Sequence, residues 1–119
     1  MENMLPLATS RQKLMYYLGN WFGPRRLFPL TVTGNSMAPL VKEGDHVLYE
    51  LADEAHIGDI VFVSHPYMQS VKLLKRVREV DADGKIFLVG DNEAESTDSR
   101  TLGWFSPNDV CGTVICRLR

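Results

Sequence analysis

Two side chains in this sequence have the chemistry of a nucleophile and of its base. Ser36 lies in the short stretch "GNSMAPL", which reads as a turn between two strand-like patterns. Lys75 lies in "SVKLLKRVREV", residues 70–80, which reads as a strand. Because alternate residues of a strand share one face, Lys75 shares its face with Leu73 and Val77. The spacing therefore predicts a lysine that points into an apolar row.

An inward lysine has two interpretations. Loss of solvent disfavours the ammonium form and lowers the pKa, and a neutral amine can act as a general base. Alternatively, Lys75 extends its alkyl chain to the edge of the sheet and has no chemical role. From parity alone the second interpretation is the commoner one.

Three histidines, His46, His56 and His65, offer a Ser-His-Asp arrangement instead. The first falls on the polar face of a predicted strand, the second in a loop and the third directly before a proline. No one of these settings indicates a catalytic histidine, so we regard a triad as the weaker alternative. The sequence has no metal-ligand spacing, and we expect neither a metal nor a cofactor.

The basic run "KLLKRVR", residues 72–78, could contact nucleic acid. The chain has 119 residues and a formal net charge of −2, and a dedicated nucleic-acid-binding domain usually has a basic excess. The run is better interpreted as the solvated face of a strand, and no nucleic-acid partner is expected.

The remaining pattern predicts a mainly β fold of short antiparallel strands with one short N-terminal helix. The "DADG" turn at 81–84 predicts a hairpin between the strands on either side of it. A polar loop covers 91–104. The predicted strands are 28–33, 45–51, 58–64, 70–80, 85–90 and 109–118.

The first 26 residues are predicted to form a helical segment that precedes a domain at 27–119. Ser10 could cap a helix over 11–21, whose apolar face would pack on the domain. The alternative is that this face, with Arg25 and Arg26 beside it, touches a partner or a membrane interface. No apolar run of about 20 residues is present, so no transmembrane anchor is expected.

Four stretches carry a resemblance to a known family: "GNSMAPLVKEGDHVLYE", "GDIVFV", "KLLKRV" and "GDNEAESTDSR". Their order and spacing resemble the boxes of type I signal peptidases, which are serine peptidases with a Ser-Lys dyad. The similarity covers about residues 28–117. It implies a signal-peptidase-like fold of twisted antiparallel sheets, or half-barrel. The chain looks most like the small soluble branch known as nickel-type superoxide dismutase maturation proteases.

The resemblance implies a role for individual residues. Ser36 matches the nucleophile and Lys75 the general base, and the backbone N–H of Ser36 is an oxyanion donor. The residues that support the site are Ser96, Asp98, Ser99 and Arg100, together with Gly90, Asp91 and Asn92 in the turn before them.

One position departs from the family pattern. Many bacterial members have a hydroxyl two positions before the nucleophile, where this sequence has Gly34. Thr33, Asn35 or a backbone group could replace that oxyanion donor. An extended peptide is expected beside residues 30–34 and 73–75, with the substrate-binding residues Val32, Thr33, Gly34, Met37 and Leu74.

The resemblance implies a cytoplasmic serine endopeptidase that removes an N-terminal extension from a precursor protein. The substrate it implies is the precursor of nickel superoxide dismutase. The alternatives are a minimal signal peptidase that cleaves exported preproteins, and a self-cleaving or non-catalytic regulator of the same fold. A regulator of that kind usually carries a DNA-binding domain, for which residues 1–26 are too short.

Overall fold

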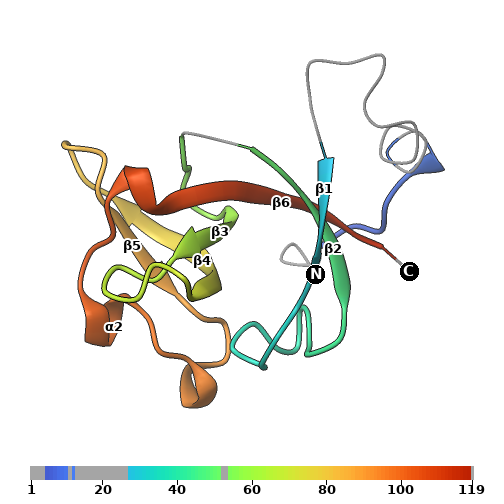
Figure 1. The fold of residues 1–119 in the computed structure, drawn as a ribbon, viewed down its shortest axis with the longest axis horizontal. Helices are drawn as coiled ribbons and strands as arrows, with labels where there is room; N and C mark the ends of the chain where they lie inside the picture. Colours follow the sequence, from blue (N-terminus) through green and yellow to red (C-terminus); the bar gives the residue numbers. More distant parts are fainter. Residues whose placement is uncertain (1–4, 11, 13–26, 52–53, 119) are drawn as a thin grey trace.

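The computed structural model describes residues 5–10, 12, 27–51 and 54–118. Six strands form one antiparallel sheet in the order β1-β2-β6-β3-β4-β5 (Figure 1). The strands are β1 (Leu27–Thr31), β2 (His46–Glu50), β3 (Ile60–Ser64), β4 (Lys72–Val80), β5 (Ile86–Val89) and β6 (Val110–Leu118). The helical elements are η1 (Glu93–Glu95), α2 (Ser99–Leu102) and η2 (Pro107–Asp109), and among the other described residues Ser10 and Gln12 are also helical. The predicted mainly β fold is confirmed.

Of the predicted N-terminal helix at 11–21 only Gln12 is described, and it is helical. The predicted cap at Ser10 is wrong, because Ser10 is itself helical and Thr9 makes the cap bonds: its Oγ1 accepts the Gln12 N–H at 3.1 Å, and its N–H donates to Gln12 Oε1 at 2.8 Å. The described part of that segment pairs with β6: Ala8 donates its N–H to the Arg117 carbonyl at 2.7 Å, and the Arg117 N–H donates to Pro6 at 2.8 Å. No helix of the described residues is long and apolar enough to cross a membrane.

The β4–β5 hairpin forms where the "DADG" turn predicted it. Asp81 and Lys85 close the hairpin through a backbone hydrogen bond of 2.9 Å. Gly84 has a φ of 82°, a left-handed conformation that favours glycine. The Asp81 carboxylate accepts the N–H groups of Asp83 at 2.9 Å and Lys85 at 2.8 Å. This hairpin fixes the register of β4, the strand that carries Lys75.

Because side chains alternate along a strand, those of β3 enter two cores on opposite faces of the sheet. Ile60 enters one core and Val61 and Val63 the other. Register shifts at three strand pairs indicate bulges, which bend and coil a sheet. The first core contains Val32, Met37, Val41, Val47, Ile60 and Val114, and the second contains Val61, Val63, Val77, Ile86, Leu88 and Phe105.

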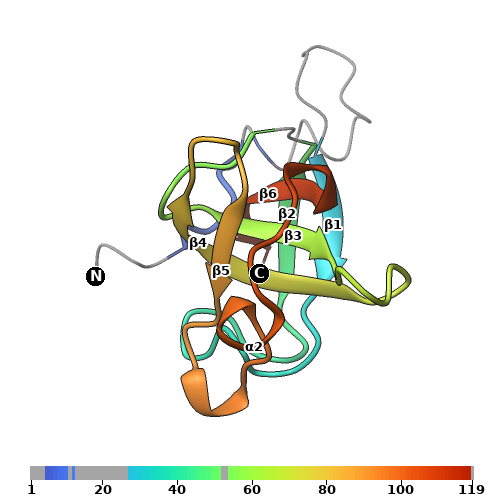
Figure 2. The same cartoon turned by 90° about the vertical axis from the view of Figure 1, so that its left-hand side faces the viewer.

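Two loops at one end of the sheet lie side by side (Figures 1 and 2). One is the β1–β2 loop, residues 32–45, and the other is the segment that follows β5, residues 90–98. A backbone hydrogen bond from Asn92 to Ser36, 2.8 Å long, joins them. The fold therefore brings together two motifs that are more than fifty residues apart in the sequence.

Candidate active site

The turn that carries Ser36 is fixed to its own loop by Glu43. Gly34 has a φ of 74° and donates its N–H to the Glu43 carboxylate at 3.0 Å. In return, the Glu43 N–H donates to the side-chain oxygen of Asn35 at 3.1 Å. Met37, which is 1% exposed, lies in the first core beneath the turn. Packing below and hydrogen bonds beside it hold the turn in one conformation.

Asn92 holds the same turn from the other side. Its backbone N–H donates to the Ser36 carbonyl at 2.8 Å, and its side-chain amide donates to the Asn35 carbonyl at 3.0 Å. In a trans peptide the N–H points away from the preceding carbonyl, so the N–H groups of Ser36 and Met37 point away from Asn92. Neither N–H has a hydrogen-bond acceptor in the part of the chain that the structure describes.

Gly90 brings the Ser36 turn into contact with Ser96. A Cβ atom on Gly90 would lie 2.2 Å from Ser96 Oγ and 2.7 Å from the Ser36 carbonyl oxygen. Both distances are far below van der Waals contact, so only glycine fits between the two serines. The predicted turn at 90–92 thus adjoins both the Ser36 turn and the predicted supporting hydroxyl.

Lys75 lies at one end of a hydrogen-bonded chain that runs through Ser96 to Asp98. Its side chain is 2% exposed, and its Nζ hydrogen-bonds Ser96 Oγ at 3.1 Å. The Ser96 hydroxyl donates its single proton to Asp98 Oδ2 at 2.6 Å, and so it accepts from Lys75. The parity prediction of an inward lysine is confirmed. Ser36 Oγ itself makes no hydrogen bond to Lys75; Ser96 is the group that contacts both the lysine and Gly90.

Asp98 is a buried carboxylate that accepts hydrogen bonds from three residues. It is 1% exposed and accepts from Ser96 Oγ, from the Gly90 N–H at 2.9 Å, and from Arg100. Arg100 donates three times: from its backbone N–H at 3.1 Å, Nε at 3.0 Å and Nη2 at 2.6 Å. Arg100 Nη1 also pairs with Glu93. The predicted charge pair of Asp98 and Arg100 is present.

The pKa values of this group follow from burial and from these contacts. Burial alone would raise the pKa of the Asp98 carboxyl, but the hydrogen bonds from Arg100, Ser96 and Gly90 outweigh it and hold that pKa well below its usual range. Burial lowers the pKa of Lys75, the Asp98 charge opposes this change, and the Arg100 charge adds to it. The net effect lowers the pKa of Lys75 and shifts its equilibrium toward the neutral amine.

Ser99 has a structural contact with β5. Its side chain is buried, and its Oγ accepts the N–H of Leu88 at 2.8 Å. This bond attaches α2 to β5 and so fixes the direction in which Asp98 and Arg100 project. Asp91, which is also among the predicted support residues, pairs with Arg76: Nε–Oδ1 is 2.8 Å and Nη2–Oδ2 is 2.9 Å.

The pairing of Arg76 with Asp91 was missed by the sequence prediction, which placed Arg76 on a solvated face. A third Arg76 bond reaches the Gly58 carbonyl at 2.9 Å. The hydrogen bond to Asp91 raises the pKa of the guanidinium. Asp91 is next to Asn92, so the strand that carries Lys75 is tied directly to the residue that holds the Ser36 turn. The signal available in the sequence was the opposite charges of Arg76, next to Lys75, and Asp91, next to Asn92.

The predicted substrate-binding residues separate into two groups. Val32 and Met37 are buried in the first core, and Leu74 packs against that core. Thr33 and Gly34 are exposed beside the turn. The first group therefore lies below the site, whereas the second lies at its surface.

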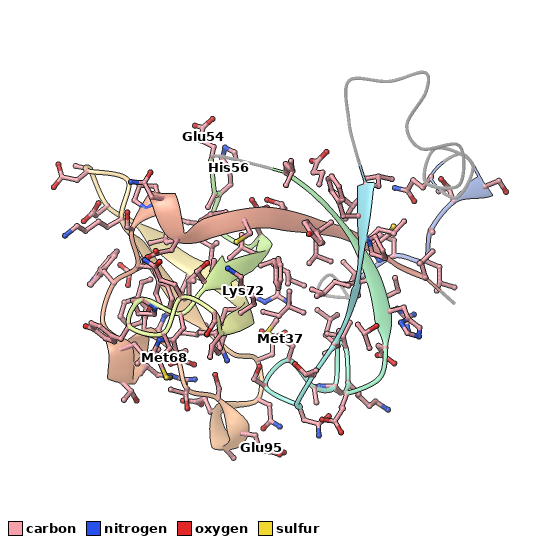
Figure 3. The ribbon with its side chains drawn as sticks, viewed as in Figure 1. Met37, Glu54, His56, Met68, Lys72 and Glu95 are labelled. Atoms are coloured by element: carbon pink, nitrogen blue, oxygen red, sulfur yellow. The ribbon has the colours of Figure 1, made fainter. Side chains whose placement is uncertain are left out.

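The histidines lie elsewhere. His46 Nδ1 hydrogen-bonds Thr31 at 3.0 Å, His65 Nδ1 accepts two backbone N–H groups, and His56 lies 3.6 Å from Asp59. Figure 3 shows His56 far from Met37, which is the neighbour of Ser36. Among the described residues no group of histidine, cysteine and carboxylate side chains could hold a metal ion.

A family model described as Peptidase S24-like matches residues 4–114, nearly the whole chain. The chain belongs to this family. Membership of the Peptidase S24-like family indicates an enzyme of the serine peptidase type. No curated protein matches the sequence. The S24-like fold agrees with the antiparallel sheet described above.

The arrangement predicts the titration of Lys75. Its ε-amine should titrate below the ordinary lysine value of ~10.4. Asp98→Asn removes a negative charge and should lower this pKa further, whereas Arg100→Gln removes a positive charge and should raise it. The measurement is an NMR titration of the labelled lysine side chain. Glu79→Gln, on an exposed part of the same strand, is the control and should have no effect. A Lys75 pKa at or above ~10.4 would contradict the site described here.

The Asn92 contacts predict a second result. Asn92→Ala removes the bond to the Asn35 carbonyl and should lower the free energy of unfolding by about 1–2 kcal/mol. Amide exchange at Ala38, whose N–H donates to the same Asn35 carbonyl at 3.1 Å, should accelerate. Glu95→Ala is the matched control, because Glu95 accepts from the same amide at 3.0 Å but lies outside the turn. Equal effects of both variants would show that Asn92 does not hold the turn.

Proposed function

We propose that this chain is a serine endopeptidase in which Ser36 is the nucleophile and Lys75 the general base. The observation that carries the proposal is a buried lysine with a lowered pKa, held by Ser96 beside the turn of Ser36. Desolvation shifts the protonation equilibrium of Lys75 toward the neutral amine, which has the free electron pair that a general base requires.

The proposed reaction has two stages. Lys75 takes the proton of Ser36 Oγ as that oxygen attacks a peptide carbonyl, and the tetrahedral intermediate collapses as the C–N bond breaks. The Lys75 ammonium gives its proton to the leaving amine. Neutral Lys75 then takes a proton from water, the resulting hydroxide attacks the ester, and the proton returns to Ser36 Oγ.

The oxyanion needs hydrogen-bond donors, and Gly34 provides no hydroxyl. The N–H groups of Ser36 and Met37 both point away from Asn92 and are the donors we assign. The side chain of Asn35, whose oxygen is engaged by Glu43, supplies a further amide donor beside the turn. Backbone groups would thus replace the hydroxyl that is absent at position 34.

The substrate would bind as an extended strand. The exposed residues Thr33 and Gly34 and the edge of β4 near Leu74 form the two sides of its path, above a floor that includes Val32 and Met37. We place this reaction in the cytoplasm and propose the precursor of nickel superoxide dismutase as the substrate. The resemblance of the four sequence boxes to the maturation proteases supports that choice.

The direct test incubates the purified chain with the nickel superoxide dismutase precursor, with a signal-peptide-bearing preprotein, and alone, and identifies new N-termini by mass spectrometry. The dismutase precursor should lose its N-terminal extension. Ser36→Ala and Lys75→Ala should each lower the rate roughly a thousand-fold or more while circular dichroism stays unchanged. Lys85→Ala, an exposed lysine, is the matched control.

Near wild-type cleavage by either variant would refute the dyad. Cleavage of the preprotein in place of the dismutase precursor would support a minimal signal peptidase. A cut in the chain itself would support a self-cleaving regulator.

A further inference from the structure

The edge of β4 is open next to Lys75. β5 pairs with β4 only from Arg76 to Val80, whereas β3 pairs with it from Lys72 to Arg76 on the opposite side. Residues 72–75 therefore have no strand partner on the β5 side among the described elements. A peptide that reaches the site can pair with this edge.

The backbone direction at this edge follows from two hydrogen bonds. His65 donates to the Val71 carbonyl, and Val77 donates to the Asp59 carbonyl, both at 2.8 Å. Antiparallel ladders alternate, so the odd-numbered residues of β4 direct their backbone groups toward β3. Lys72 and Leu74 then direct their N–H and C=O groups toward the open edge. They are the two residues that an added strand would pair with.

The loop that joins β3 to β4, residues 65–71, continues this edge; we name it the hairpin tip. Figure 2 shows it projecting beyond the sheet. Three apolar side chains are exposed on it: Tyr67 at 76%, Met68 at 53% and Val71 at 39%. An apolar surface of this kind on a loop indicates a binding role.

Side-chain hydrogen bonds order the backbone of the hairpin tip. The His65 side chain is buried, and its Nδ1 accepts the N–H groups of Tyr67 at 3.1 Å and Met68 at 3.2 Å. Lys72 Nζ donates to Ser64 Oγ at 2.7 Å and to the Gln69 carbonyl at 3.2 Å, which joins the two arms of the hairpin. The apolar side chains are thus presented by an ordered backbone, which lowers the entropy lost on binding.

We propose that Tyr67, Met68 and Val71 form a distal subsite that binds an apolar side chain of the substrate. The occupant is the precursor's own extended chain, because the hairpin tip continues the edge on which that chain would pair. This inference rests on the proposed peptidase function. Val71 is four residues from Lys75, about 13 Å along a strand, so the bound side chain lies roughly four to six residues from the scissile bond. Lys72 Nζ already donates to Ser64 and Gln69 within the hairpin, and the three side chains assigned to the subsite are all apolar.

The test uses synthetic peptides that span the mapped cleavage site of the precursor. Each carries one phenylalanine or one glutamate about four to six residues from the scissile bond, on one side or the other. On one of the two sides, phenylalanine should give a KM about ten-fold lower than glutamate, with kcat unchanged. The double variant Tyr67→Ser, Met68→Ser should abolish that difference. Ile57→Ser, at a residue 69% exposed on another loop, is the matched control and should preserve it.

Three outcomes would overturn the inference. Peptides cleaved with the same KM whatever residue stands at these positions would refute the distal subsite and leave the peptidase function standing. Binding of the wild-type chain to phosphatidylglycerol vesicles, lost in the double variant while every KM is unchanged, would assign the hairpin tip to a membrane. Absence of any Ser36-dependent cleavage would refute the proposed function and this inference with it.

Discussion

The site depends on one buried carboxylate. Asp98 accepts hydrogen bonds from a side chain on each side of it and from two backbone N–H groups, and it has almost no contact with solvent. Through Ser96 it orients the amine of Lys75, and through the Gly90 N–H it fixes the turn that lies against Ser36. An unpaired carboxylate at this depth would cost several kcal/mol, so Arg100 is a necessary part of the arrangement.

The same arrangement resolves an electrostatic conflict. A general base at position 75 must be neutral, yet a carboxylate near it favours the ammonium form. Burial lowers the pKa of Lys75, and the positive charge of Arg100 opposes the field of Asp98. Ser96 stands between the two groups, so the lysine hydrogen-bonds a hydroxyl instead of forming an ion pair. The site thus combines an oriented lysine with a lowered pKa.

The sequence was most informative where local rules apply. Strand alternation predicted the burial of Lys75, and the "DADG" turn predicted the hairpin that sets the register of its strand. The contacts of Arg76 with Asp91 and of Asn92 with the Ser36 turn could not be predicted in the same way. They depend on which residues of β4 and β5 face each other, and on two loops meeting across more than fifty residues of sequence. Glu43 was missed because a glutamate near a Gly-Asp turn resembles any surface charge.

The role of Lys75 as general base is tested most directly by comparing two pKa values of the same protein. One comes from the pH dependence of single-turnover peptide cleavage and the other from the NMR titration of the Lys75 side chain. If Lys75 is the general base, cleavage accelerates with rising pH as the amine loses its proton, and the two pKa values coincide below ~10.4. A rate profile that follows a group near 6.5 and moves when a histidine is replaced would contradict that role.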